Sequence, residues 1–220
     1  RVGMIFQDPM SSLTPFLRVG EQMCEGLIHH QGLSAAAAKQ RALEVLELVR
    51  IPDAKRRYNQ YPHELSGGMK QRVMIGQAIM CKPAVLVADE PTTALDVTVQ
   101  AQILEILEGL KGHTDTAIVM ITHDLGVIAG ICQRVLVMYG GRVVEEGPID
   151  DIFYNPHHPY TQGLLRSVPD FDLDPSQPLA AIPGQPPTPN QLPAGCSFAP
   201  RCSYTEELCR RDTPQMMTHG

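Results

Sequence analysis

The sequence predicts an α/β fold in which helices flank a parallel β-sheet. Short apolar runs rich in β-branched residues alternate along the chain with longer segments that have helical periodicity. Strands that alternate with helices in this way pair in parallel. One run, Ala84–Ala88, is apolar throughout, as in a strand buried on both faces of its sheet. Because the composition changes after about residue 155, we expect an α/β domain over residues 1–155 and an extension over residues 156–220.

The first expected elements are one strand and two helices. Residues Val2–Phe6 read as a strand that leads into the loop Gln7–Pro9. Helix signals follow at Val19–His30. The next helix begins after Ser34, a residue type that favours the N-cap, and runs to about Arg50.

The remaining elements follow a glycine pair. Gly67 and Gly68 open a helix that we expect to reach Met80 and to end before Pro83, ahead of the strand Ala84–Ala88. Later elements are a helix at Val97–Leu110, a buried strand at Ala117–Ile121, a helix at Leu125–Ile131, and strands at Arg134–Met138 and Arg142–Glu145 that Gly140-Gly141 joins in a hairpin.

Composition excludes several function classes. The formal charge of −6 argues against a nucleic-acid binder with a basic face. No apolar run approaches the roughly 18–20 residues that span a bilayer, and no signal peptide opens the chain. We therefore expect a soluble protein of the cytoplasm whose membrane role, if it has one, comes through a partner.

Two adjacent carboxylates, Asp89 and Glu90, follow the apolar run. Phosphoryl transfer from ATP requires Mg²⁺ on the phosphates and an oriented water. Asp89 at a strand end suits Mg²⁺, and Glu90 is placed to act as a general base toward the water. Two solvated acids at a strand end are the alternative, which the motifs on either side disfavour.

Ser66, Gly67 and Gly68 precede the start of a helix. Unpaired backbone N–H groups and the helix dipole attract anions there, and small residues let a phosphate approach. Such a sequence is commonly a plain helix start. Its continuation into Met69–Arg72, followed later by Asp89-Glu90, favours a nucleotide site.

His123 and Gln7 each follow an expected strand. An imidazole in this position can form a hydrogen bond with a γ-phosphate. The Gln7 amide is placed to contact a metal-bound water and a moving loop. A lone histidine here is commonly structural, but its position after a strand favours a role in the site.

In this order, the motifs resemble those of the ABC transporter ATPases. Phe6–Pro9 resembles the Q-loop, Leu65–Arg72 the signature motif, Val85–Glu90 the Walker B strand, Thr93–Asp96 the D-loop and Thr122–Asp124 the H-loop. The segment between Gln7 and Ser66 resembles the helical subdomain that docks on membrane subunits, so this subdomain is expected at about residues 19–80.

The resemblance implies a P-loop NTPase-like ABC nucleotide-binding domain that uses ATP and Mg²⁺. It implies catalytic roles for Glu90, His123 and Gln7, and Mg²⁺ contacts for Asp89 and Gln7. Two subunits of this family pack head-to-tail, so Ser66, Gly67 and Gly68 would serve the partner's nucleotide. Gln71 and Asp96 are expected as further nucleotide contacts.

The 220 residues lack the family's Walker A loop, Gly-x-x-x-x-Gly-Lys-Ser/Thr. Lys70 cannot replace its lysine, because Lys70 belongs to the signature helix. The chain begins at Arg1 rather than Met. We therefore expect a fragment that is truncated at both ends and inactive by itself, and an ATPase in the full-length protein.

The tail resembles the oligopeptide/dipeptide branch of these transporters. Twelve of the nineteen prolines fall between Pro156 and Pro214, which predicts a largely extended tail. The resemblance implies an importer of di- or oligopeptides, with importers of nickel, glutathione or murein peptides as alternatives. The segments that carry it are Ser11–Pro15, His157–Thr161, Ile182–Pro187 and Gly195–Cys202.

Cys196, Cys202 and Cys209 have the spacing C-x5-C-x6-C. Thiolates so spaced can hold a [4Fe–4S] cluster or Zn²⁺, both of which usually need a fourth ligand. The branch typically supplies a further cysteine downstream as the fourth ligand. His219 is another candidate for that ligand, supported only by its proximity in the sequence. Three reduced thiols in a structural loop are the alternative. Cys24, Cys81 and Cys132 are expected to be small core side chains.

The resemblance also implies partners and a location. These are a second, paralogous ABC ATPase subunit, transmembrane permease subunits and, indirectly, a substrate-binding protein, at the cytoplasmic face of the inner membrane. A soluble ABC ATPase of DNA repair or translation is disfavoured by the short Gln7–Ser66 segment and the acidic charge. A degenerate, non-catalytic cassette would not need Glu90 or His123.

Overall fold

The computed structural model describes residues 1–8, 12–93, 95–113, 116–168 and 181–217. The chain forms two compact units, Arg1–Ile131 and Cys132–Gly220. The boundary between these units falls before residue 155, where the change in composition predicted a boundary. The predicted domains, 1–155 and 156–220, stay a prediction.

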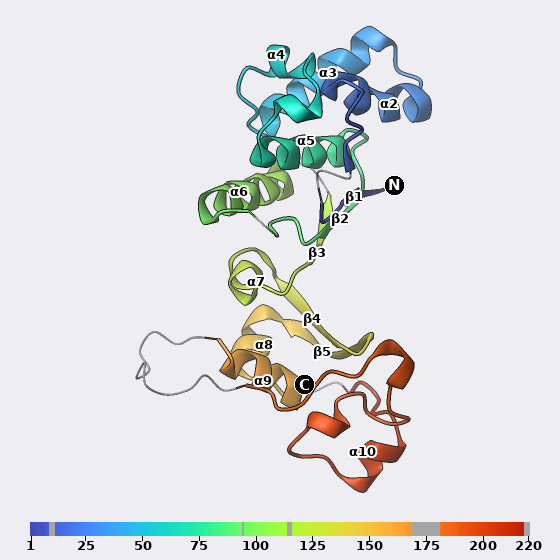
Figure 1. The fold of residues 1–220 in the computed structure, drawn as a ribbon, viewed down its shortest axis with the longest axis vertical. Helices are drawn as coiled ribbons and strands as arrows, with labels where there is room; N and C mark the ends of the chain where they lie inside the picture. Colours follow the sequence, from blue (N-terminus) through green and yellow to red (C-terminus); the bar gives the residue numbers. More distant parts are fainter. Residues whose placement is uncertain (9–11, 94, 114–115, 169–180, 218–220) are drawn as a thin grey trace. The chain divides into compact units, whose positions relative to one another are not determined.

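A parallel three-stranded sheet organises the first unit (Figure 1). Its strands are β1 (Val2–Ile5), β2 (Val85–Asp89) and β3 (Ala117–Ile121), in the order β1-β2-β3. All pairs are parallel, with Ile5 opposite Ala88 and Asp89 opposite Ile121. The predicted α/β class is confirmed, and the residues that follow the three strands share one edge of the sheet.

The burial of the sheet differs from the prediction. In β2 the side chains alternate: Leu86 and Ala88 are fully buried, but Val85 and Val87 are only half-buried. In β3 every second residue is exposed. The expectation of strands buried on both faces is therefore wrong for the described residues. The exposed residues of β3 alternate along the strand and so lie on one face of the sheet, which the described residues leave uncovered.

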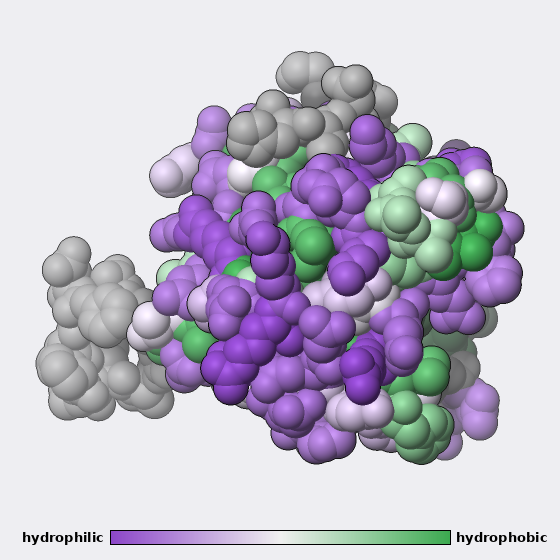
Figure 2. All heavy atoms as spheres, turned by 90° about the horizontal axis from the view of Figure 1, so that it is seen from above, coloured by the Kyte–Doolittle hydropathy of each residue, from purple (hydrophilic) through white to green (hydrophobic). Residues whose placement is uncertain are grey.

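A group of helices packs together beside the sheet. They are α2 (Val19–Gln31), α3 (Ala35–Leu48), the unpredicted α4 (Ala54–Tyr58), the 3-10 turn η1 (Pro62–Glu64) and α5 (Gly67–Ile79). Ser34 forms the predicted N-cap of α3, because its Oγ accepts a hydrogen bond from the Ala37 amide over 3.3 Å. The core between the helices contains the buried residues Met23, Leu46 and Ile75. From the side of these helices the surface is mostly hydrophilic, with smaller hydrophobic groups (Figure 2).

Two further helices complete the first unit. Helix α6 (Val97–His113) buries Ile103 and Leu107, and α7 (Leu125–Ile131) has the predicted bounds. No helix in the described part of the chain is both long enough and apolar enough to cross a membrane.

The second unit begins with the predicted hairpin. Strands β4 (Arg134–Tyr139) and β5 (Arg142–Pro148) are antiparallel, and Tyr139 pairs with Arg142. Gly140 and Gly141 have φ of 56° and 77°, the left-handed values that this two-residue turn requires. Helices α8 (Ile149–Tyr154), α9 (Pro159–Arg166) and α10 (Glu207–Arg211) and the 3-10 turns η2 (Pro189–Gln191) and η3 (Ala199–Arg201) follow.

Helix α9 was not predicted in the extended tail. Pro159 is its first residue, where a fixed φ suits a helix, and the His158 ring accepts a hydrogen bond from the Tyr160 amide. The Tyr160 ring packs against Tyr139 and Phe198, with ring centroids 4.6 and 5.4 Å away. An aromatic cluster therefore holds α9, the hairpin and the tail together.

Candidate active site

The carboxylate of Glu90 is the meeting point of side chains from three strand ends. Gln7, after β1, donates its Nε2 hydrogen to Glu90 Oε2 over 2.8 Å. His123, after β3, places Nδ1 3.2 Å from Glu90 Oε1. The structure thus brings together the three residues that the sequence predicted to be catalytic, while their roles stay a prediction.

A fourth residue, Thr93, was not predicted as part of this group. Its hydroxyl donates to Glu90 Oε2 over 2.8 Å, and its backbone N–H donates to the Glu90 carbonyl over 3.1 Å. The hydrogen bonds from Thr93, His123 and Gln7 lower the pKa of the Glu90 carboxyl, and the bond from Thr93 has the largest effect. Glu90 is therefore ionised at neutral pH.

The backbone at Glu90 is strained. Its φ is 43°, in the left-handed region that residues with a Cβ rarely adopt. Such a conformation costs of order 1–3 kcal/mol and persists only where the surroundings hold it. The hydrogen bond from the Glu90 N–H to the Ile121 carbonyl, at 2.9 Å, helps to hold it.

Gln71 lies in the core rather than at the surface. Only 2% of the residue is exposed, and its amide donates to the Pro91 carbonyl over 2.6 Å. This bond joins α5 to the residue that follows Glu90. The amide nitrogen of Gln71 is thus hydrogen-bonded to Pro91. The contact between Gln71 and a nucleotide stays a prediction.

Ser66, Gly67 and Gly68 begin α5. The Ser66 hydroxyl accepts a hydrogen bond from the Met69 amide over 3.4 Å, so Ser66 is the N-cap. Ser66 and Gly67 are exposed, and a Cβ on Gly68 would lie 2.9 Å from the Val99 side chain. No hydrogen bond among the described residues joins these three to Glu90. Their predicted contact with a partner's nucleotide is untested.

The two other predicted acids have different surroundings. Asp89 ends β2 half-buried, directly before Glu90. Asp96 accepts a hydrogen bond from the Val99 amide over 3.0 Å and so caps the first turn of α6. Its predicted role as a nucleotide contact stays a prediction.

The donor set near Glu90 fits Mg²⁺. The carboxylate of Asp89 and the amide oxygen of Gln7 are hard oxygen ligands, which Mg²⁺ prefers alongside water. Both residues stand at the carboxyl ends of paired parallel strands. These residues therefore suit a magnesium–phosphate group.

The cysteine-rich tail does not present a comparable site. Cys196, Cys202 and Cys209 are half-buried free thiols, and the Cys196 amide donates to the Cys209 carbonyl over 2.8 Å. Among the described residues, no group of three or more His, Cys, Asp or Glu side chains is placed to hold a metal ion. The arrangement does not fit the predicted cluster or Zn²⁺, and His219 lies outside the described residues.

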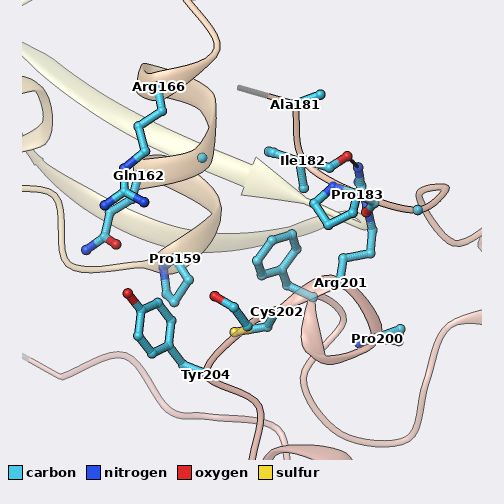
Figure 3. Close-up of a pocket in the computed structure, with 14 residues that line it drawn as sticks. Pro159, Gln162, Arg166, Ala181, Ile182, Pro183, Pro200, Arg201, Cys202 and Tyr204 are labelled. Carbon is cyan, nitrogen blue, oxygen red and sulfur yellow. Dashed lines mark hydrogen bonds between the residues drawn. The ribbon is translucent and has the colours of Figure 1, made fainter. Parts of the chain in front are cut away.

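Cys202 instead lines a hollow of about 450 Å³ in the second unit (Figure 3). Gln162 and Arg166 of α9 lie on one side of it, and Tyr204 lies at its edge. The Arg201 guanidinium donates to the carbonyls of Ile182 and Pro183 over 3.0 and 2.8 Å. Of the other cysteines, Cys24 is buried as predicted, and Cys81 and Cys132 are half-buried.

Two protein-family models match the chain. The model described as ABC transporter matches residues 1–93. The model described as the C-terminal region of oligopeptide/dipeptide transporters matches residues 144–209. The first covers Gln7, Ser66, Glu90 and Thr93, and the second covers the three tail cysteines.

Curated relatives are similar over nearly the whole chain. The oligopeptide transport ATP-binding protein OppD of Salmonella typhimurium is 55% identical over 214 residues, which are 97% of this chain and 64% of that protein. OppD of Haemophilus influenzae is 52% identical over 222 residues, 100% of this chain and 68% of that protein. The chain thus spans about two thirds of the length of these relatives.

Solved structures with a similar fold are ATP-binding cassettes. The cassette MJ0796, in a post-hydrolysis dimer bound to ADP and Pi, has a TM-score of 0.58 and 32% identity over 68% of this chain and 63% of that one. The structure of cbiO1 from Clostridium perfringens, part of the ABC transporter complex cbiONQ, has a TM-score of 0.62 and 28% identity over 70% of this chain and 59% of that one.

Proposed function

The chain belongs to the ABC transporter family and carries the C-terminal region of its oligopeptide/dipeptide transporters, and on this premise we propose that the full-length protein is the ATP-hydrolysing subunit of an oligopeptide importer. The observation that carries the proposal is the convergence of Gln7, Thr93 and His123 on Glu90. The names of the relatives support oligopeptides over nickel or glutathione as the solute.

Each residue of the site has a proposed task. Asp89 and Gln7 would hold Mg²⁺, which when bound neutralises charge on the phosphates. Glu90, ionised at neutral pH, takes the proton that the attacking water loses. His123 donates a hydrogen bond to the γ-phosphate. Because the 220 residues contain no Walker A loop, the proposal concerns the full-length protein.

The proposed partners follow from the family. A second, paralogous ATPase subunit would pack head-to-tail with this one, and Ser66, Gly67 and Gly68 would contact the nucleotide of that subunit. Permease subunits would hold the pair at the cytoplasmic face of the inner membrane, and a binding protein would deliver the peptide. No cluster or zinc enters the proposal, because the described thiols do not form a metal site.

ATP turnover by the full-length protein, assembled with its permease in vesicles, tests the proposal. Glu90→Gln should abolish turnover while ATP still drives dimerisation, whereas Glu108→Gln, on the exposed face of α6, should leave turnover unchanged. Near-normal hydrolysis in Glu90→Gln would remove Glu90 as the base. Stimulation by Ni²⁺-loaded rather than peptide-loaded binding protein would reject oligopeptide as the solute.

The proposed contact between Ser66 and the nucleotide of the partner subunit has a separate test. Ser66→Arg places a long side chain at the exposed N-terminus of α5, where a partner's phosphate would approach. Turnover should fall through a clash there. Unchanged turnover in Ser66→Arg would count against the partner contact.

A further inference from the structure

The hollow in the second unit carries positive charge in a chain that is acidic as a whole. Two arginines, Arg166 and Arg201, line it, and none of its described lining residues is acidic. The whole chain, by contrast, has a formal charge of −6. Neither arginine forms an ion pair with a carboxylate of the described residues. The hollow therefore attracts a ligand that carries negative charge.

The two arginines of the hollow differ in how they are held. The guanidinium of Arg201 donates to the carbonyls of Pro183 and Ile182, and its third nitrogen donates to the Tyr139 hydroxyl over 3.3 Å. Arg166, the last residue of α9, is exposed and has no hydrogen bond to a described group. Its guanidinium is therefore available to bind a carboxylate through two parallel hydrogen bonds, while Arg201 adds charge and fixes the loop.

The remaining lining supplies an acceptor and apolar surface. The Gln162 amide nitrogen donates to the Pro156 carbonyl over 3.0 Å, and its Oε1 is left to accept a hydrogen bond from a ligand. Ile182 and Phe198 contribute apolar side chains. Figure 3 shows Gln162 and Arg166 together on α9, across the hollow from Ile182. A ligand with a carboxylate, an N–H group close to it and an apolar side chain matches these features.

We propose that the hollow binds the carboxyl end of a short free peptide. The carboxylate lies on Arg166, a backbone N–H donates to Gln162 Oε1, and the last side chain packs against Ile182 and Phe198. The volume of about 450 Å³ is that of a small-ligand site. Because no described lining residue is acidic, the amino end of the peptide stays in solvent.

The choice of a peptide as the ligand deepens the proposed function and rests on it. An importer of oligopeptides releases its solute on the side of the membrane where its ATPase subunit works. Imported peptide therefore reaches the second unit directly. The hollow gives the ATPase subunit a contact with the product of transport that is separate from the residues around Glu90.

Calorimetric titration of the full-length protein with trileucine tests the proposal. Trileucine amide, which lacks the carboxylate, should bind about ten-fold more weakly, as for a lost hydrogen bond between charged groups that are partly exposed. N-acetyl-trileucine should bind as trileucine does. Arg166→Gln should lose the same affinity for trileucine, and Ile182→Ala a smaller part of it. Arg210→Gln, an exposed arginine of α10 outside the hollow, is the matched control and should keep the wild-type affinity.

Several results would overturn the proposal. These are no binding of trileucine at millimolar concentration, equal affinity for trileucine and its amide, or wild-type affinity in Arg166→Gln. Inorganic phosphate that bound as tightly as trileucine, with the same dependence on Arg166, would make the hollow a general anion site and reject the peptide. The titration needs no ATP. A protein that hydrolyses no ATP would refute the proposed function, while the titration would still decide whether the hollow binds a peptide carboxylate.

Discussion

The side-chain amide of Gln71 donates a hydrogen bond to the backbone carbonyl of Pro91, twenty residues along the chain, over 2.6 Å. The bond joins a buried turn of α5 to the residue directly after Glu90. The helix that begins with Ser66 and the turn that carries the proposed base are therefore linked within one subunit. A shift of α5 would be transmitted to the backbone at Glu90.

Replacing Gln71 should measure this link. In Gln71→Met the volume is nearly kept, but the buried Pro91 carbonyl loses its partner, so the free energy of unfolding should fall by about 1–3 kcal/mol. Urea unfolding of the full-length protein measures the change. Gln40→Met, on the exposed face of α3, is the control and should stay within about 0.5 kcal/mol of the wild type. Equal stability of both variants would show that the bond contributes nothing.

Two glycines in helices should respond to alanine with opposite signs. A Cβ on Gly20 would lie 2.2 Å from the Tyr58 ring, which contacts Cys24 and Lys39. Gly20→Ala should therefore destabilise the protein by about 1–3 kcal/mol through overpacking. A Cβ on Gly109 meets nothing within 4 Å, so Gly109→Ala should stabilise it by about 0.5–1 kcal/mol. Thermal or urea unfolding that ranked the variants in the reverse order would refute this packing at Tyr58.

The N-caps of α3 and α5 allow stability and activity to be separated. Ser34→Ala and Ser66→Ala each remove a hydroxyl that accepts from the helix's first turn, so each should lower stability by about 1 kcal/mol. Only Ser66→Ala should also lower ATP turnover of the assembled transporter, because only Ser66 is proposed to face a phosphate. Equal turnover in the two variants would limit Ser66 to capping.

Histidine 158 should make stability depend on pH. Burial lowers the pKa of His158 below 6.5, and its neutral ring accepts the Tyr160 amide at the start of α9. Between 6.5 and the lower folded value the unfolded chain binds more protons, so the free energy of unfolding falls as the pH falls through this window.

His158→Asn keeps a capping acceptor and removes the titration. Between about pH 7.5 and about pH 5.5, the protection of the α9 amides against hydrogen exchange should drop less in this variant than in the wild type. Exposed His29 provides the control His29→Asn, which should keep the wild-type dependence. If His158→Asn kept the wild-type dependence on pH, a group other than His158 would be its cause.

Strong local signals made much of the fold predictable. Ser34 has the hydroxyl that an N-cap needs, and Gly140-Gly141 has the backbone freedom that a tight hairpin turn needs. The structure confirms both the N-cap and the hairpin. Helix α9 was missed because its stability depends on Tyr139 and Phe198, which are distant in sequence. The burial of β3 was misjudged for a similar reason, since apolar composition does not show whether other elements cover both faces of a strand.

The site was predictable in part. Gln7, Glu90 and His123 follow parallel strands, and such strands end at one edge of a sheet, so their meeting follows from the sequence pattern. The bonds of Thr93 and Gln71 depend on the left-handed backbone at Glu90 and on rotamers, which no spacing reveals. Conversely, the close spacing of the tail cysteines did not amount to a described metal site.

The half-exposed β3 bears on how the protein behaves at high concentration. Val119 and Ile121 are 51% and 48% exposed on a strand that, in the described residues, has a pairing partner on one side only. A row of unpaired N–H and C=O groups beside apolar side chains is a template for intermolecular strand pairing. This sheet edge therefore affects the solubility of the protein more than the stability of its folded units. Replacing the exposed Val119 by lysine is expected to raise that solubility.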